Sequence, residues 1–120
     1  MLMTNFKIIL AYNGTAYHGW QRQNNALAVQ QVLEEAILSL TGQTVTVNGC
    51  SRTDAGVHAR RFCASFLIES TITCRGIVFG LNSKLPDDIV SLFVKTVDKM
   101  NMTEAVEQSR YFDLFAIAEF

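Results

Sequence analysis

The sequence predicts an α+β fold in which two helices cover one face of an antiparallel sheet. Four segments alternate apolar and polar residues, as strands do, and two longer segments repeat apolar residues at helical spacing. The order of these segments along the chain is β-α-β-β-α-β. The length of 120 residues, 49% of them hydrophobic, suits one compact domain with its own core and is too short for two.

The first two elements are a strand and a helix. In residues 6–12 every second side chain is apolar on one face, and the turn pair Asn13-Gly14 ends the strand. Residues 28–41 repeat apolar side chains every three or four positions, which predicts one apolar helix face, and Gly42 ends the helix. The polar side chains of this helix are expected to face away from the core: Gln30, Gln31, Glu34, Glu35 and Ser39.

The remaining elements complete the pattern. Residues 44–48 ("TVTVN") predict a short strand, and residues 61–69 ("RFCASFLIE") predict a longer one. Residues 71–85 predict a second helix, and residues 88–97 predict the last strand. Three side chains of that helix are expected to face the sheet: Ile77, Val78 and Leu81. This order of elements is typical of the ferredoxin-like arrangement.

Two segments follow from this pattern. Residues 1–98 are expected to form the α/β domain, and residues 99–120 are expected to form a divergent, helical tail. Thr103 is a suitable cap for a helix in that tail. The end of the tail is rich in large apolar side chains, which predicts that it is buried against the sheet or against a partner.

Composition and charge exclude several classes of protein. The 18% of charged residues and the single proline argue against disorder, and we find no apolar run that suits a membrane span or an export signal. The three cysteines form no C-x-x-C pair, and His18 and His58 have no carboxylate at ligand spacing, so we expect no disulfide framework and no metal site. Reduced thiols indicate the cytoplasm. The net charge is −1, but cations outnumber acids in residues 1–84, which permits a basic face.

The segment "GCSRTDAGVHAR" places an aspartate between turn formers and arginines. Cations such as Arg52 and Arg60 near Asp54 would favour its ionised form, as a nucleophile or a base requires. Alternatively, an aspartate in a turn bonds its own backbone. Residues so close in sequence are hard to place in relay geometry, which disfavours a catalytic relay of Ser51, His58 and Asp54.

A second unusual segment is "YNGTAYHGWQRQNN", residues 12–25, which is rich in aromatic and amide side chains. Tyr17 and Trp20 offer flat faces for RNA bases, and Arg22 offers a contact for phosphate. The alternative is that the rings of Tyr17 and Trp20 cover one end of the sheet.

Four motifs, in this order, resemble those of a known family: "YNGTAYHGWQRQ", "VQQVLEEAI", "GCSRTDAGVHAR" and "FGLNSKLPDDI". From Phe6 to Val97 the chain is similar to the N-terminal half of the TruA-type tRNA pseudouridine synthases, and the "RTDAGVHA" element is highly specific. The resemblance implies half of a pseudouridine synthase fold and an isomerase that converts uridine to pseudouridine in the anticodon stem-loop of tRNA. It also implies a homodimer that needs no cofactor and no metal.

The resemblance further implies roles for single residues. Asp54 matches the catalytic nucleophile of the family, and its charge would meet the positive charge that develops on the sugar as the glycosidic bond breaks. Three actions fit this carboxylate: attack on the sugar, addition to the base, or removal of a sugar proton. Arg52 matches the arginine that enters the RNA beside the flipped nucleotide. His58 and Arg60 are expected to contact the RNA backbone, and the tyrosine-tryptophan loop is expected to lie near the RNA.

The chain departs from the family after the last predicted strand. Family members continue into a second half, which brings a tyrosine that stacks on the target base, whereas this sequence ends at Phe120. One expectation is therefore a truncated enzyme that is inactive, or nearly so, by itself. The other is a non-catalytic RNA-binding or oligomerising half-domain derived from that enzyme.

Overall fold

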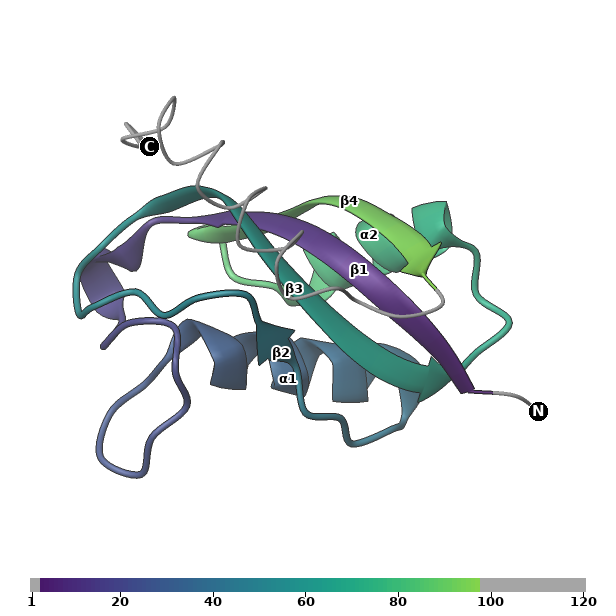
Figure 1. Ribbon diagram of the computed structural model, residues 1–120, viewed down its shortest axis with the longest axis horizontal. Helices are drawn as coiled ribbons and strands as arrows, with labels where there is room; N and C mark the ends of the chain where they lie inside the picture. The colour runs from purple at the N-terminus through teal and green to yellow at the C-terminus, as the bar shows by residue number, and fades with distance from the viewer. Residues whose placement is uncertain (1–2, 98–120) are drawn as a thin grey trace.

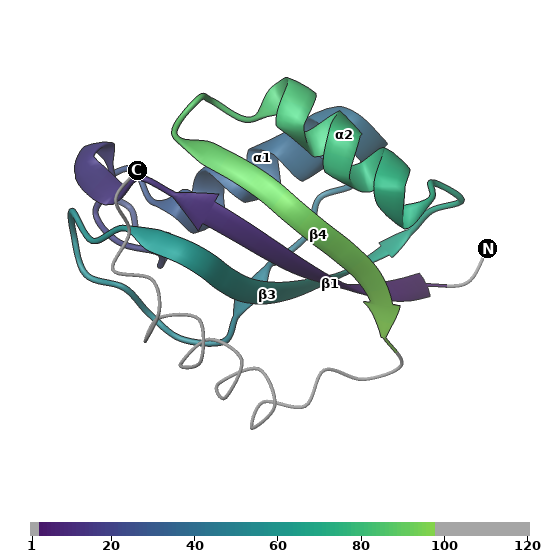
Figure 2. The ribbon, with the colours of Figure 1, turned by 90° about the horizontal axis from the view of Figure 1, so that it is seen from above.

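The computed structural model describes residues 3–97, which form one sheet with two helices (Figure 1). The elements follow in this order: β1 (Met3–Tyr12), a short 3₁₀ helix (Gly14–Ala16), α1 (Val29–Thr41), β2 (Asn48–Gly49), β3 (Ala59–Glu69), α2 (Cys74–Lys84) and β4 (Ile89–Val97). The sheet order is β2-β3-β1-β4, and all paired strands are antiparallel. Both helices lie on the same side of the sheet (Figure 2), so the predicted α+β, ferredoxin-like fold is confirmed. The tail predicted for residues 99–120 lies outside the described residues.

The core lies between the sheet and the two helices. Where β1 pairs with β3, Phe6 stands opposite Phe66 and Ile8 stands opposite Ala64. The two phenylalanine rings stack with their centroids 5.7 Å apart, and all four side chains are at most 2% exposed. The apolar face predicted for these two strands is therefore confirmed, and β1 also buries residues of its other face.

Both helices turn an apolar face to this core. α1 buries Leu33 and Ile37 and is followed by Gly42, as predicted. The Asn82 side chain ties α2 to β4, because it accepts a hydrogen bond from the N–H of Ser91 at 2.7 Å and donates one to the carbonyl of Ser91 at 2.9 Å. α2 faces the core with the three side chains predicted for it: Ile77, Val78 and Leu81.

The strand predicted for residues 44–48 is largely absent, and its hydrogen bonds come from helix α1 instead. Only β2, at the end of this segment, joins the sheet beside β3. The N–H of Val47 donates to Oε2 of Glu34 at 2.9 Å, and the carbonyl of Val47 accepts from Nε2 of Gln30 at 3.0 Å. Since both backbone groups of Val47 have partners on the helix, the segment needs no neighbouring strand at that point.

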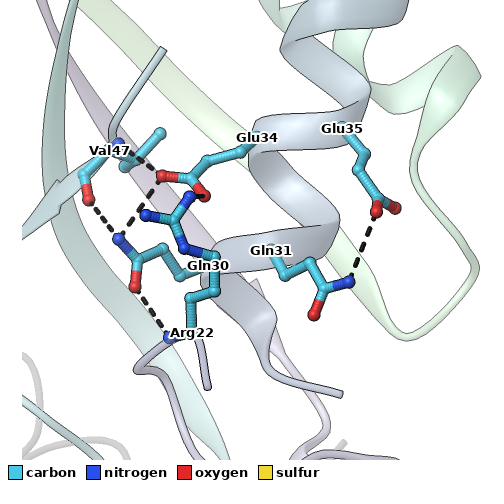
Figure 3. A network of polar contacts seen from close by, with 6 residues as sticks. All are labelled: Arg22, Gln30, Gln31, Glu34, Glu35 and Val47. Atoms are coloured by element: carbon cyan, nitrogen blue, oxygen red, sulfur yellow. Dashed lines mark hydrogen bonds and ion pairs between the residues drawn. The ribbon is translucent and has the colours of Figure 1, made fainter. Parts of the chain in front are cut away.

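These contacts also correct the prediction that Gln30 and Glu34 face away from the core. Their side chains are buried, with 7% and 8% of their surface exposed. Glu34 also pairs with Arg22, and Nη1 of the guanidinium lies 2.7 Å from Oε1 of the carboxylate (Figure 3). A buried carboxylate is tolerated when hydrogen bonds and a cation compensate its charge in this way.

Glu34→Ala is expected to lower the free energy of unfolding by about 2 kcal/mol, because the buried N–H of Val47 loses its acceptor. Glu35→Ala removes the same charge from an exposed position of the same helix and is expected to change this free energy by less than about 0.5 kcal/mol. Urea denaturation followed by circular dichroism measures both variants. Equal losses in the two would contradict the structural role of Glu34.

Candidate functional site

The loop between β2 and β3, residues 50–58, carries the aspartate that the sequence singles out. A β-turn spans Asp54 to Val57 and is closed by a hydrogen bond from the N–H of Val57 to the carbonyl of Asp54 at 3.2 Å. Gly56 takes its third position with a φ of 77°, as a type II turn requires. The Asp54 side chain is exposed, and within residues 3–97 it forms no ion pair and no hydrogen bond to its own backbone. The carboxylate is therefore open to a substrate.

A second loop, residues 13–25, packs against this one and fixes its path. The N–H of Gly56 donates to the carbonyl of Tyr17 at 3.0 Å, and the N–H of Trp20 donates to the carbonyl of Thr53 at 3.3 Å. These bonds join backbone to backbone, one just before the turn and one within it. The turn is thus held by the main chain itself, in the manner of a short ladder between two strands.

Side chains reinforce the contact between the two loops. The hydroxyl of Tyr12, at the end of β1, lies 2.7 Å from Oγ1 of Thr53. His58 accepts a hydrogen bond from the N–H of Gly14 through Nδ1 at 2.8 Å. Because Nδ1 accepts this bond, it cannot donate to Asp54, as a serine-histidine-aspartate relay would need. This bond ties His58, just before β3, to the loop that follows β1.

The two loops approach each other so closely that two glycines are required. A Cβ atom at Gly14 would lie 1.9 Å from the carbonyl oxygen of Val57, and one at Gly19 would lie 2.2 Å from the carbonyl oxygen of Thr53. Gly19 also has a φ of 80°, which side chains disfavour. The sequence identifies Gly14 as a turn residue but does not reveal this second requirement, because the partner loop lies far away along the chain.

The rings of Tyr17 and Trp20 are buried, with 4% and 2% of their surface exposed. Trp20 stacks on Phe62 of β3, with the ring centroids 4.3 Å apart. Burial raises the pKa of Tyr17, as does the hydrogen bond that its hydroxyl donates to Asp88 at 2.5 Å, so the hydroxyl remains protonated. These contacts favour the alternative in which both rings cover one end of the sheet.

The arginines expected around the aspartate do not pair with it. Arg52 is exposed on the loop, and Arg60 is exposed near the start of β3. No ion pair joins either of them to Asp54 within the part of the chain that the structure describes. Arg60 belongs to β3 and Asp54 to the turn before it, and closeness in sequence does not become an ion pair here.

Arg22 and Arg52 line the same groove, which has a volume of about 760 Å³ and runs beside the edge strand β2. Trp20 and Ser51 also contribute to its wall. Asp54 is not one of the lining residues of this groove. The structure thus brings together three of the predicted RNA-binding residues, Trp20, Arg22 and Arg52, whereas the predicted nucleophile lies outside the lining of this groove.

Three further observations concern cysteines, metals and membranes. Cys50, Cys63 and Cys74 form no disulfide, and the first two are buried. Among residues 3–97, no three histidine, cysteine, aspartate or glutamate side chains gather as a metal would need. Neither helix of that range has the length and the apolar character to cross a membrane.

Comparison with known proteins identifies relatives of this chain. A family model described as tRNA pseudouridine synthase matches residues 8–106. A tRNA pseudouridine synthase A of Clostridium kluyveri is 52% identical over 96 residues, which are 80% of this chain and 39% of the relative. The protein of the same name from a Thermoanaerobacter species is 44% identical over 110 residues, which are 91% of this chain and 45% of the relative. The chain spans about two-fifths of the length of the curated relatives that it matches.

Gly19→Ala is expected to lower the free energy of unfolding by about 3 kcal/mol, because the new methyl group adds a clash with the partner loop to the strain of a positive φ. Gly42→Ala is the matched control, since Gly42 has a φ of 74° but a Cβ atom placed there would have nothing within 4 Å. It is expected to lose only about 1 kcal/mol. Thermal or urea unfolding of both variants measures the difference. Similar losses would show that the loops do not pack as closely as described.

Proposed function

The chain belongs to the tRNA pseudouridine synthase family, and from this premise we propose that it is the part of such an isomerase that carries the catalytic aspartate. The observation that carries the proposal is the exposed Asp54 on a turn that a second loop holds in place. The chain covers about two-fifths of its relatives, so the proposed activity is that of this part together with the segments that complete them.

In the proposed reaction, uridine in tRNA becomes its isomer pseudouridine. The bond between N1 of the base and C1′ of the ribose breaks, the base turns, and a new bond forms between C5 and C1′. The hydrogen on C5 leaves as a proton, and N1, which carries no hydrogen in uridine, takes up a proton, so the composition of the nucleotide does not change. The isomerisation involves no net oxidation or reduction, so the proposal invokes neither cofactor nor metal.

Asp54 supplies the negative charge for this reaction. Positive charge develops on the sugar when the glycosidic bond breaks, and a nearby carboxylate can stabilise or capture it. Such stabilisation is strongest when the charged group is already in place before the reaction. The hydrogen bonds of Gly56 and Thr53 to the neighbouring loop support this pre-organisation.

Arg22 and Arg52 bind the tRNA backbone along their common groove. A guanidinium group presents several N–H donors in one plane, which matches the geometry of phosphate. Arg52 also enters the RNA beside the flipped nucleotide, and Arg60 on β3 adds a contact to the backbone. The other residues of the proposed site hold the two loops in place: Tyr17, Trp20 and His58.

The proposed setting is a homodimer in the cytoplasm, as the family resemblance implies. The sequence pattern of the three cysteines, which contains no C-x-x-C pair, supports a reducing compartment. Leu92 and Phe93 on β4 are 43% and 52% exposed, and such apolar side chains on an edge strand support association with another chain.

A second candidate function is an RNA-binding module without catalysis. The observation that favours it is that the groove of Arg22 and Arg52 does not include Asp54, so RNA binding does not depend on the carboxylate. This candidate predicts tRNA binding that weakens with salt, as phosphate contacts do, and no isomerisation.

Asp54→Asn is expected to lower the release of tritium from tRNA labelled at uridine C5 by more than about a hundredfold. The assay uses the chain alone and a chimera in which it replaces the matching segment of the Clostridium kluyveri relative, which supplies the rest of the protein. Asp87→Asn removes another exposed carboxylate and is the control that is expected to keep full activity.

The outcomes separate the two candidate functions. Tritium release that survives Asp54→Asn in the chimera would contradict the assignment of the catalytic residue. A chimera that binds tRNA with the usual salt dependence but releases no tritium would favour the binding module. A loss of stability in Asp54→Asn would point to a structural role, which is not expected because the side chain is exposed.

A further inference from the structure

Arg22 is held both at its backbone and at the end of its side chain. Its backbone N–H donates to Oε1 of Gln30 at 2.8 Å, and its Nη1 donates to Oε1 of Glu34 at 2.7 Å. Figure 3 shows the side chain reaching across to helix α1, with both partners on one face of that helix. The position of the guanidinium is therefore set by α1.

Glu34 and Gln30, the two side chains that hold Arg22, are themselves held in place by hydrogen bonds. Oε2 of Glu34 accepts hydrogen bonds from the N–H of Val47 at 2.9 Å and from Nε2 of Gln30 at 3.4 Å. Gln30 also donates to the carbonyl of Val47 at 3.0 Å, which fixes the orientation of its amide. Both anchor side chains are more than nine-tenths buried, so neither can follow Arg22 into solvent.

These contacts leave most of the N–H donors of the guanidinium available. The side chain of Arg22 remains 52% exposed, whereas that of Glu34 is 8% exposed. Only one of the guanidinium N–H groups is used on Glu34, which leaves several donors for a ligand. Arg22 lies in the wall of the groove that it shares with Arg52, where phosphate is proposed to bind.

We propose that Glu34 is a positioning residue for tRNA: it holds Arg22 in the orientation that binds an RNA phosphate in the groove. This inference rests on the proposed function, because it names how the same site takes hold of its substrate. An arginine that is already fixed gives up less side-chain freedom when it binds, so the pairing strengthens RNA binding even though it adds a negative charge.

The sign of one substitution separates this proposal from simple electrostatics. E34Q removes a negative charge close to the groove, so charge alone predicts tighter binding of the polyanionic RNA. The positioning role predicts the opposite, because glutamine holds the guanidinium less firmly than a carboxylate does. E35Q makes the same change of charge on the exposed side of the helix, without a contact to Arg22, and is the matched control.

The experiment measures the binding of unmodified tRNA to the full chain over a range of salt concentrations. Arg22→Ala is expected to weaken binding roughly tenfold and to reduce the salt slope by about one. E34Q is expected to weaken binding about threefold or more, and the double variant is expected to bind no more weakly than Arg22→Ala, since Glu34 acts through Arg22. E35Q is expected to bind as tightly as the unsubstituted chain, or more tightly.

A second variant tests the proposal without disturbing the contacts of Glu34 that stabilise the fold. Arg22→Lys leaves all contacts between Glu34, Gln30 and Val47 in place and keeps the positive charge. Lysine lacks the planar guanidinium, however, and so cannot bind the carboxylate and a phosphate through one planar group. It is expected to weaken binding about threefold with an unchanged salt slope. E34Q or Arg22→Lys binding as tightly as the unsubstituted chain would overturn the proposal, as would additive losses in the double variant.

The same measurements distinguish a failure of this inference from a failure of the proposed function. Salt-sensitive binding that is indifferent to E34Q overturns only the positioning role and leaves the function of the site intact. Absence of tRNA binding in the unsubstituted chain and in the chimera contradicts the proposed function itself. Asp87→Asn is expected to bind tRNA as the unsubstituted chain does, because Asp87 is exposed and does not line the groove.

Discussion

The arrangement around Asp54 depends on the close backbone contact between two loops. The loop that follows β1 meets the loop that precedes β3 at distances that leave no space for a Cβ atom at Gly14 or Gly19. Because the contact is made by main-chain groups, it fixes the turn without occupying the aspartate side chain. The core contributes from below, where the buried ring of Trp20 stacks on β3. A rigid turn with an open carboxylate is the result.

A buried carboxylate performs a similar task at the edge of the sheet. Glu34 takes the place of a missing strand partner for Val47, and it also directs Arg22 toward the groove. One side chain of α1 thus links the end of the sheet, the loop after β1 and the proposed RNA-binding groove. Desolvation of a single carboxylate is costly, and here several donors and one cation offset it. The fold and the candidate site therefore share the same polar contacts.

The sequence predicts well those elements of the fold that depend on residues close to one another along the chain. Alternation in residues 6–12 predicts the buried face of β1, and the motif around Asp54 identifies the family. It does not predict the burial of Glu34, since helical periodicity follows apolar residues and the partners of this carboxylate lie elsewhere along the chain. For the same reason, the choice between base stacking and core packing for Trp20 stays open until the two loops are seen together. The proximity of Arg60 to Asp54 along the chain also produces no ion pair within the described residues.

Amide hydrogen exchange on the unsubstituted chain tests most directly the claim that the turn of Asp54 is held by the neighbouring loop. The N–H groups of Gly56 and Trp20 donate across the contact between the loops, so they are expected to exchange slowly and at a common rate. The N–H of Asn24, which makes no hydrogen bond within the described residues, is the internal reference and is expected to exchange nearly as fast as an unstructured peptide. Exchange at Gly56 as fast as at Asn24 would contradict the account.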